Sequence, residues 1–171
     1  KDIFSLFMHN KIWLGYGFNA GNAYFKIPVE TKPDYAAGVY NDETGLVKFR
    51  NCHWYTNLDH NKRHEEIDLV CHYSEGEYPT YDNYEAIHVK TINDIPVDYS
   101  GIMAVPITII NKYNPEQFEI LGNSQFLVRT LSDDVRQHGD YAQIGRFYID
   151  RKDGTYKKMY ERLVVKRKGD N

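Results

Sequence analysis

The most apolar stretch of an otherwise polar sequence covers residues 102–110, where isoleucine and valine dominate. Such β-branched side chains favour a buried strand. Pro106 interrupts the run, and proline has no N–H to donate to a sheet ladder. We therefore expect an edge strand, or two strands broken at Val105–Pro106, rather than one central strand.

A short helix is expected directly after this run, over residues 114–122. Asn114 can cap its N-terminus, Pro115 suits the first helical position, and Gln117 completes the spacing of a capping box. Gly122 suits the C-terminal stop. Residues 99–122 are thus predicted to form a core strand that leads into a capped surface helix.

The rest of the pattern predicts short strands separated by polar loops. Residues 3–9 have the spacing of a helix end, and Tyr78, Tyr81 and Tyr84 indicate irregular backbone held by aromatic packing. Strands are expected over 11–18, 46–58, 86–89 and 125–130, and loops over 28–46 and 132–140. Near the end, residues 144–152 and 155–168 flank Asp153-Gly154, a strong hairpin signal. The sequence therefore predicts a mixed α/β (α+β) fold with a C-terminal hairpin.

Length and composition limit the classes of protein to which this chain can belong. The 171 residues suit one ordinary domain with a real core. The sequence holds no run of eighteen apolar residues and no signal peptide. Its two cysteines, Cys52 and Cys71, are too few for a disulfide scaffold and favour a reducing cytoplasm. Because the chain starts at Lys1 rather than Met, we expect it to begin within a longer protein or after trimming.

Charge is distributed unevenly along the chain. Residues 141–171 hold nine Lys or Arg against four Asp or Glu, whereas residues 1–140 hold 12 against 20. Clustered basic residues bind phosphate backbones, and a two-stranded ribbon can enter a major groove. A solvated strand face, or a segment docked on the acidic body, explains the same pattern, so all three interpretations stay open.

Histidines give two patterns that resemble zinc sites. His60 and His64 would share one face of a helix, but no third ligand is evident. Cys52-His53 and Cys71-His72 place neighbouring side chains on opposite faces of a strand, which does not suit one metal ion. There is no phosphate loop and no nucleophile elbow. The residues alone indicate a binding module, with a metal-dependent hydrolase built on His60 and His64 as a minor alternative.

Several blocks resemble the adenine-specific DNA methyltransferases of the EcoRI modification-methylase type. These blocks are KIWLGYGFN at 11–19, CHWYTNLDH at 52–60, DNYEAI at 82–87, and the stretch 101–122, which contains KYNPEQFE. The closing YERLVVKRK at 160–168 is similar to the basic C-terminal strand of that family. The blocks span nearly the whole chain in the order found in the family.

The resemblance implies an S-adenosylmethionine-dependent enzyme of a restriction-modification system. That family binds the cofactor in an N-terminal Rossmann-like module and carries an Asn-Pro-Pro-Phe-type tetrapeptide, and neither occurs in this sequence. We therefore expect the C-terminal part of such an enzyme, inactive alone and without catalytic, cofactor-binding or metal-binding residues. Residues 1–58 would be a remnant of the Rossmann-like catalytic sheet, and residues 59–171 a β-rich target-recognition region. Expected partners are double-stranded DNA and the missing N-terminal catalytic region, in the cytoplasm and away from membranes.

A methyltransferase must extrude its target base, so one surface has to grip the backbone and flanking bases. By the resemblance, Trp54, Tyr55, Thr56 and Asn57 lie where the pocket for the flipped base is often lined. Other DNA contacts are expected from exposed side chains of the 112–119 block and from the basic C-terminal segment: Lys112, Tyr113, Gln117, Arg146, Arg151, Lys152, Lys157, Lys158, Arg162, Lys166 and Arg167. His53 and residues 139–155 match the family less well. The main alternative is a stand-alone, non-catalytic DNA-binding or interaction module.

Overall fold

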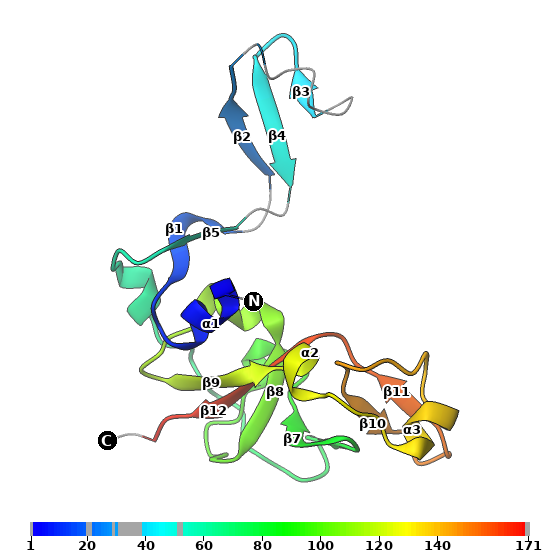
Figure 1. Cartoon of the computed structure of the whole chain (residues 1–171). Helices are drawn as coiled ribbons and strands as arrows, with labels where there is room; N and C mark the ends of the chain where they lie inside the picture. The colour runs from blue at the N-terminus through cyan, green and yellow to red at the C-terminus, as the bar shows by residue number, and fades with distance from the viewer. Residues whose placement is uncertain (1, 20–21, 29, 31–38, 51–52, 170–171) are drawn as a thin grey trace.

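The structure is a computed structural model that describes residues 2–19, 22–28, 30, 39–50 and 53–169 (Figure 1). Its body is a five-stranded sheet of order β6-β7-β8-β12-β9. The strands are β6 Thr80–Tyr81, β7 Tyr84–His88, β8 Ile102–Pro106, β9 Phe118–Asn123 and β12 Arg162–Arg167. Strands β7 and β8 are parallel, and the other neighbouring pairs are antiparallel. The fold is therefore mixed α/β. The last strand in the sequence, β12, lies between β8 and β9 and not at an edge of the sheet.

Three smaller sheets surround this body. Strands β1 Trp13–Asn19 and β5 His53–Thr56 form an antiparallel ribbon, as do β10 Tyr148–Asp150 and β11 Tyr156–Lys158. Strands β2 Asn22–Lys26, β3 Tyr40–Asn41 and β4 Leu46–Arg50 form a three-stranded sheet that stands away from the body in Figure 1. The strand expected at 11–18 is thus confirmed as β1.

The described helices are short. They are α1 Asp2–Met8, α2 Ser124–Leu127 and α3 Asp133–His138, with 3₁₀ turns at Asn61–His64, Ile92–Asp94 and Ile107–Lys112. None of the helices in the described ranges has the length and apolar character that a membrane crossing needs.

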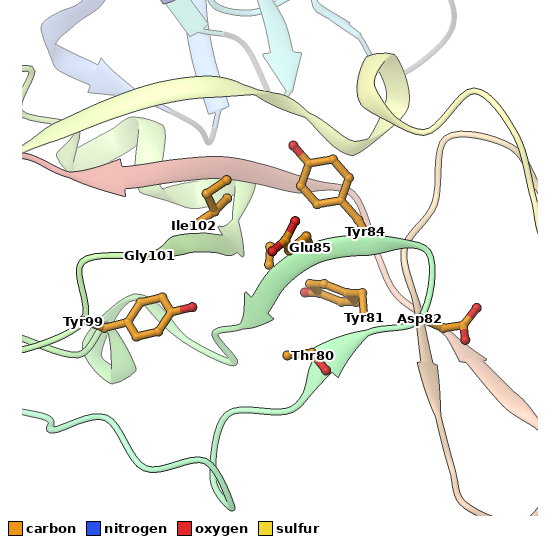
Figure 2. Close-up of a pocket in the computed structure, with 9 residues that line it drawn as sticks. Thr80, Tyr81, Asp82, Tyr84, Glu85, Tyr99, Gly101 and Ile102 are labelled. Atoms are coloured by element: carbon orange, nitrogen blue, oxygen red, sulfur yellow. The ribbon is translucent and has the colours of Figure 1, made fainter.

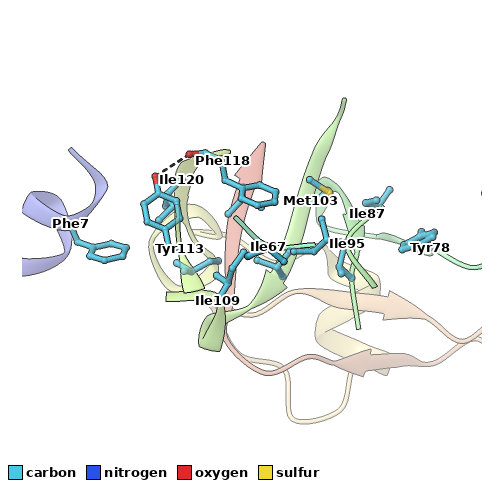
Figure 3. Packing of buried hydrophobic residues seen from close by; sticks show 14 residues of the cluster. Phe7, Ile67, Tyr78, Ile87, Ile95, Met103, Ile109, Tyr113, Phe118 and Ile120 are labelled. Carbon is cyan, nitrogen blue, oxygen red and sulfur yellow. Dashed lines mark hydrogen bonds between the residues drawn. The ribbon is translucent and has the colours of Figure 1, made fainter. Parts of the chain in front are cut away.

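Both faces of the main sheet carry a hydrophobic cluster, because successive side chains of a strand point to opposite sides. Leu163 and Val165 of β12 belong to the first cluster, which Phe118 and Ile109 also join (Figure 3). Val164 belongs to the second, where the β10/β11 hairpin places Phe147. Phe7 of α1 is 3% exposed and packs into the first cluster, so the N-terminal helix is joined to the body.

Pro106 has a milder effect than expected. It ends β8, which lies between β7 and β12 and is not an edge strand. The residues after it form a 3₁₀ helix instead of a second strand. Proline is tolerated because it occupies the last ladder position, opposite Arg162, where the strand stops.

The prediction of a helix over residues 114–122 is wrong. Asn114 does cap, since its Oδ1 accepts a hydrogen bond from the N–H of Glu116 at 2.8 Å, but only one turn follows. Strand β9 then begins at Phe118, with Phe118 and Ile120 buried and Glu119 exposed between them. This period-two alternation overrides the local capping signals.

Two further predictions are wrong because short helices begin where a strand and a loop were expected. The strand expected at 125–130 is the short helix α2, capped where Asn123 Oδ1 accepts from the N–H of Phe126 at 3.3 Å. The loop expected at 132–140 contains α3, capped by Ser132, whose hydroxyl accepts from the N–H of Val135. Both caps use residues that are favoured at this position.

The basic segment at the C-terminus is divided between two sheets. Asp153 and Gly154 lie in the turn between β10 and β11, where Gly154 has a φ of +84°. Residues 162–167, in contrast, leave the hairpin and enter the main sheet as β12. The segment therefore does not form one continuous two-stranded ribbon.

Candidate nucleic-acid interface

The four residues expected at the flipped-base pocket lie at β5 and just beyond it. The side chains of Trp54 and Tyr55 are 44% and 40% exposed, and Asn57 is exposed as well. Thr56 is half-buried, and its hydroxyl accepts a hydrogen bond from the N–H of Leu58 at 3.0 Å. The β1/β5 ribbon thus presents two large aromatic side chains that are partly open to solvent.

Gly15 of β1 provides the space for Trp54. A Cβ atom at this position would lie 2.2 Å from two ring atoms of Trp54. The indole therefore lies directly against the backbone of β1, which fixes its orientation.

We expect Gly15→Ala to displace the Trp54 ring and to lower the free energy of unfolding by about 1–3 kcal/mol, the usual range for overpacking. The displacement is read from the Trp54 indole N–H signal in an NMR spectrum, and the stability from denaturant unfolding. Gly76→Ala is the matched control, because a Cβ atom there meets nothing within 4 Å. An unchanged Trp54 signal in Gly15→Ala would contradict the packing described.

Two of the three residues expected to be exposed in the 112–119 block are structural. Tyr113 is 8% exposed, and its hydroxyl donates to the carbonyl oxygen of Phe118 at 3.1 Å (Figure 3). Gln117 is half-buried, and its side-chain amide bonds both the N–H and the C=O of Ile67, at 2.9 and 2.7 Å. Their expected exposure is therefore wrong, whereas Lys112 does lie at the surface.

Several basic residues of the C-terminal segment are already paired. Arg151 forms an ion pair with Asp140, and Lys152 Nζ lies 3.2 Å from Asp150 Oδ2. An Nη atom of Arg146 lies 3.8 Å from Glu161 Oε2. Such exposed or partly exposed pairs contribute little to stability.

The remaining basic residues of the C-terminal segment differ in how far their side chains are exposed to solvent. Arg162 is only 7% exposed, so most of its side chain is covered by neighbouring residues. Arg167 donates a hydrogen bond to the carbonyl oxygen of Val97. Lys157 and Lys166 are exposed, and so is Lys168, which the sequence reasoning left out. Lys158 is half-buried, with its Nζ 5.6 Å from the ring centre of Tyr141.

These lysines fall into two groups at different places on the surface. Lys157 and Lys158 lie on β11, whereas Lys166 and Lys168 lie at the C-terminal end of β12, on the opposite side of the body in Figure 1. The fold has therefore separated charges that are close in sequence.

An open cavity of about 690 Å³ lies where β6 and β7 meet the segment before β8 (Figure 2). Tyr81, Tyr84 and Tyr99 line it together with the acidic residues Asp82 and Glu85. In Figure 2 the hydroxyl groups of Tyr81 and Tyr99 point toward the same space from opposite sides. Sequence reasoning missed this cavity, because the strand order brings Tyr99 to the same space as Tyr81 and Tyr84.

The cavity has the chemistry of a base-binding site rather than a phosphate-binding one. Burial raises the pKa of Tyr81, Tyr84 and Tyr99 further above neutral pH, where a tyrosine hydroxyl is already protonated. Aromatic faces stack on bases, and carboxylates accept hydrogen bonds from amino groups such as N4 of cytosine. The same carboxylates repel phosphate.

The histidines expected as possible zinc ligands serve other partners. His60 Nε2 lies 2.9 Å from the carbonyl oxygen of Leu14, and His64 Nε2 lies 2.8 Å from Asp59 Oδ1. Cys52 lies outside the described residues. Within the described part of the chain, no group of three or more His, Cys, Asp or Glu is placed to hold a metal ion.

Comparison with known proteins gives a family match over nearly the full length. The family model described as "Adenine-specific methyltransferase EcoRI" matches residues 1–168. The chain belongs to the EcoRI adenine-specific methyltransferase family. The resemblance inferred from the sequence blocks is thus confirmed.

Three curated relatives are type II methyltransferases. The chain is 44% identical over 125 residues to M.EcoRI of Escherichia coli, a match that covers 71% of this chain and 38% of the relative. It is 30% identical to M.MgeORF184P of Mycoplasma genitalium and to M.MpnI of Mycoplasma pneumoniae, over 98% of this chain and 53% of each relative. The chain thus spans about half the length, or less, of these relatives. No solved structure matches it.

The match to the EcoRI methyltransferase family includes all the features described above. The β1/β5 ribbon, the tyrosine cavity and both groups of lysines lie within residues 1–168. Membership therefore applies to the whole described body and not to one motif.

Proposed function

We propose that the chain is the C-terminal, DNA-recognition portion of an S-adenosylmethionine-dependent, adenine-specific DNA methyltransferase of a restriction-modification system. The family match over residues 1–168 carries this proposal, together with the fact that the matches cover only 38–53% of the three curated relatives. The cofactor and the catalytic tetrapeptide would belong to the N-terminal region of the same protein. Alone, this chain would bind DNA and transfer no methyl group.

Within this proposal, residues 1–58 would adjoin the catalytic region, as the end of its Rossmann-like sheet, and residues 59–171 would form the recognition region. Support comes from the separate pairing of β1 with β5, outside the five-stranded sheet that residues 80–167 form. Phe7 would join the two parts, because its ring centre lies 5.6 Å from that of Tyr113 and its side chain packs into the first cluster.

DNA contacts would come from three kinds of side chain. Trp54 and Tyr55 offer aromatic surface for a base, the tyrosine cavity offers a second aromatic site with carboxylate acceptors, and Lys112, Lys157, Lys158 and Lys166 offer charge for backbone phosphates. Double-stranded DNA and the N-terminal catalytic region would be the partners, in the cytoplasm.

The test measures two activities of the purified chain. We expect salt-dependent binding to a labelled DNA duplex by fluorescence anisotropy, and no transfer of a labelled methyl group from S-adenosylmethionine. Reading the gene upstream of the Lys1 codon should give an Asn-Pro-Pro-Phe-type tetrapeptide. Methyl transfer by this chain alone, or a gene start close to Lys1, would contradict the proposal, and the second result would favour a stand-alone DNA-binding module.

A further inference from the structure

Arg162 is a buried cation that has no counter-ion among the described residues. It is the first residue of β12, 7% exposed, and pairs with Pro106 of β8. Its Nε is enclosed and has no hydrogen-bond partner. Its terminal nitrogens also make no hydrogen bond to the described residues, but they are not enclosed in the same way. A buried charge is normally paired, so this arrangement calls for an explanation.

The acidic residue next to Arg162 does not neutralise it. Glu161 precedes it in the chain, but its carboxylate accepts a hydrogen bond from Asn123 Nδ2 at 3.0 Å and lies near Arg146. Burial lowers the pKa of Arg162, and the nearby group that acts against this effect is the hydroxyl of Tyr81 rather than a carboxylate. Within the described ranges, no carboxylate therefore forms an ion pair with this guanidinium.

His88 provides a hydrogen-bond donor on the same face of the sheet. It pairs with Ala104, which in turn pairs with Val164, two residues from Arg162 on the same side of β12. The hydroxyl of Tyr81 lies 2.7 Å from His88 Nδ1. If that hydroxyl donates, the neutral imidazole carries its proton on Nε2.

The charged groups that lower the pKa of His88 are basic residues. Burial, followed by Arg162, Lys157 and Lys90, lowers the pKa of His88 to about 4. Lys90 follows β7 and Lys157 lies on β11, and both are exposed. One buried arginine and two exposed lysines are therefore close enough to His88 to act on its charge. The charge near His88 is thus opposite in sign to that of the tyrosine cavity, which is lined by the acidic residues Asp82 and Glu85.

We propose that Arg162, Lys90 and Lys157 bind a phosphate group, with His88 Nε2 as an additional donor. Guanidinium and ammonium groups are the usual partners of phosphate, and partial burial strengthens the charge-assisted hydrogen bonds. The assignment of this group to the DNA backbone rests on the proposed function. Tyr81 belongs to both sites, because it lines the tyrosine cavity and bonds His88. A phosphate at Arg162 therefore positions a neighbouring nucleotide beside that cavity.

The first test uses the wild-type chain and inorganic phosphate. We expect phosphate to shift the NMR signals of Arg162 Nε–H and of the His88 ring, and to raise the pKa of His88, because a bound anion favours the imidazolium form. The charged groups that face His88 in this titration are Arg162, Lys157 and Lys90. Chloride at the same ionic strength is the control. Unchanged Arg162 and His88 signals would overturn the proposal.

The second test uses a DNA duplex and Arg162→Met. Loss of one phosphate contact should weaken binding about 10-fold and reduce the slope of log K against log salt concentration by about 0.9, equally for all sequences. The melting temperature should stay the same or rise, because an unpaired buried charge is removed, whereas a merely structural arginine would lower it. Arg129→Gln removes the same charge from an exposed site and should change affinity less than twofold.

The outcomes separate the two proposals. If phosphate shifts the Arg162 and His88 signals but the wild-type chain binds no duplex, the anion site stands and the DNA-recognition function fails. If the chain binds duplex and Arg162→Met keeps the wild-type salt slope, the phosphate site proposed here is wrong. The phosphate titration gives a result even if the variant does not fold.

Discussion

Replacing Lys157, Lys158, Lys166 and Lys168 together by glutamine is expected to weaken duplex binding on the order of 10²- to 10³-fold at 0.1 M salt. Four lost phosphate contacts should also reduce the salt slope by about 3.6. All four side chains are at least partly exposed, and none forms an ion pair with a described residue. Anisotropy titrations at several salt concentrations measure both quantities.

The two groups of lysines should then be changed separately. Lys157 and Lys158 lie on the hairpin, and Lys166 and Lys168 at the end of β12, so additive losses would indicate that one duplex reaches both groups. Lys11→Gln with Lys26→Gln serves as the control, because it removes two exposed charges from the N-terminal region. If the fourfold variant binds as tightly as the wild type, the basic segment does not contact the backbone.

Phe118→Ala should lower the free energy of unfolding by about 3–5 kcal/mol, which is typical for removal of a buried aromatic ring. Phe118 is fully buried in the first cluster, and its carbonyl oxygen accepts the hydroxyl of Tyr113 (Figure 3). Denaturant unfolding followed by circular dichroism gives the value.

Glu119→Ala is the matched control for this variant, since the neighbouring side chain is exposed and should change stability by less than about 0.5 kcal/mol. Ile120→Ala should again be costly, about 2–5 kcal/mol, because Ile120 is buried on the same face as Phe118. An equal cost at all three positions would argue against the strand β9.

Elements of this fold can be predicted from the sequence where they depend on interactions between residues that are close together in the chain. Strand β1 and the turn at Asp153-Gly154 follow from local patterns, and they are found at the expected positions. Asn114 caps a turn as expected, but the helix does not continue, because Phe118 and Ile120 gain more from the core cluster than from helical geometry. Local capping residues indicate where a helical turn begins, but they do not determine how many residues the helix contains.

The candidate site was less predictable than the fold. Tyr113, Gln117 and Arg162 have the chemical character of DNA-contacting residues, yet they are at least partly buried. Their contacts include residues far away in sequence: Phe7 packs against Tyr113, Ile67 forms hydrogen bonds with Gln117, and Arg162 pairs with Pro106 of β8. The tyrosine cavity needs Tyr99 to approach Tyr81 and Tyr84 across the sheet edge. Neither result can be read from spacing, because both depend on the strand order.

The position of β12 between β8 and β9 has a consequence for biosynthesis. Both neighbouring strands precede it in the chain, so their inner edges have no partner until residues 162–167 leave the ribosome. Unpaired strand edges invite association with other chains. The main sheet therefore closes only after translation of this segment, and messages truncated before the codon for Arg162 should yield aggregated polypeptide rather than a shortened, folded protein.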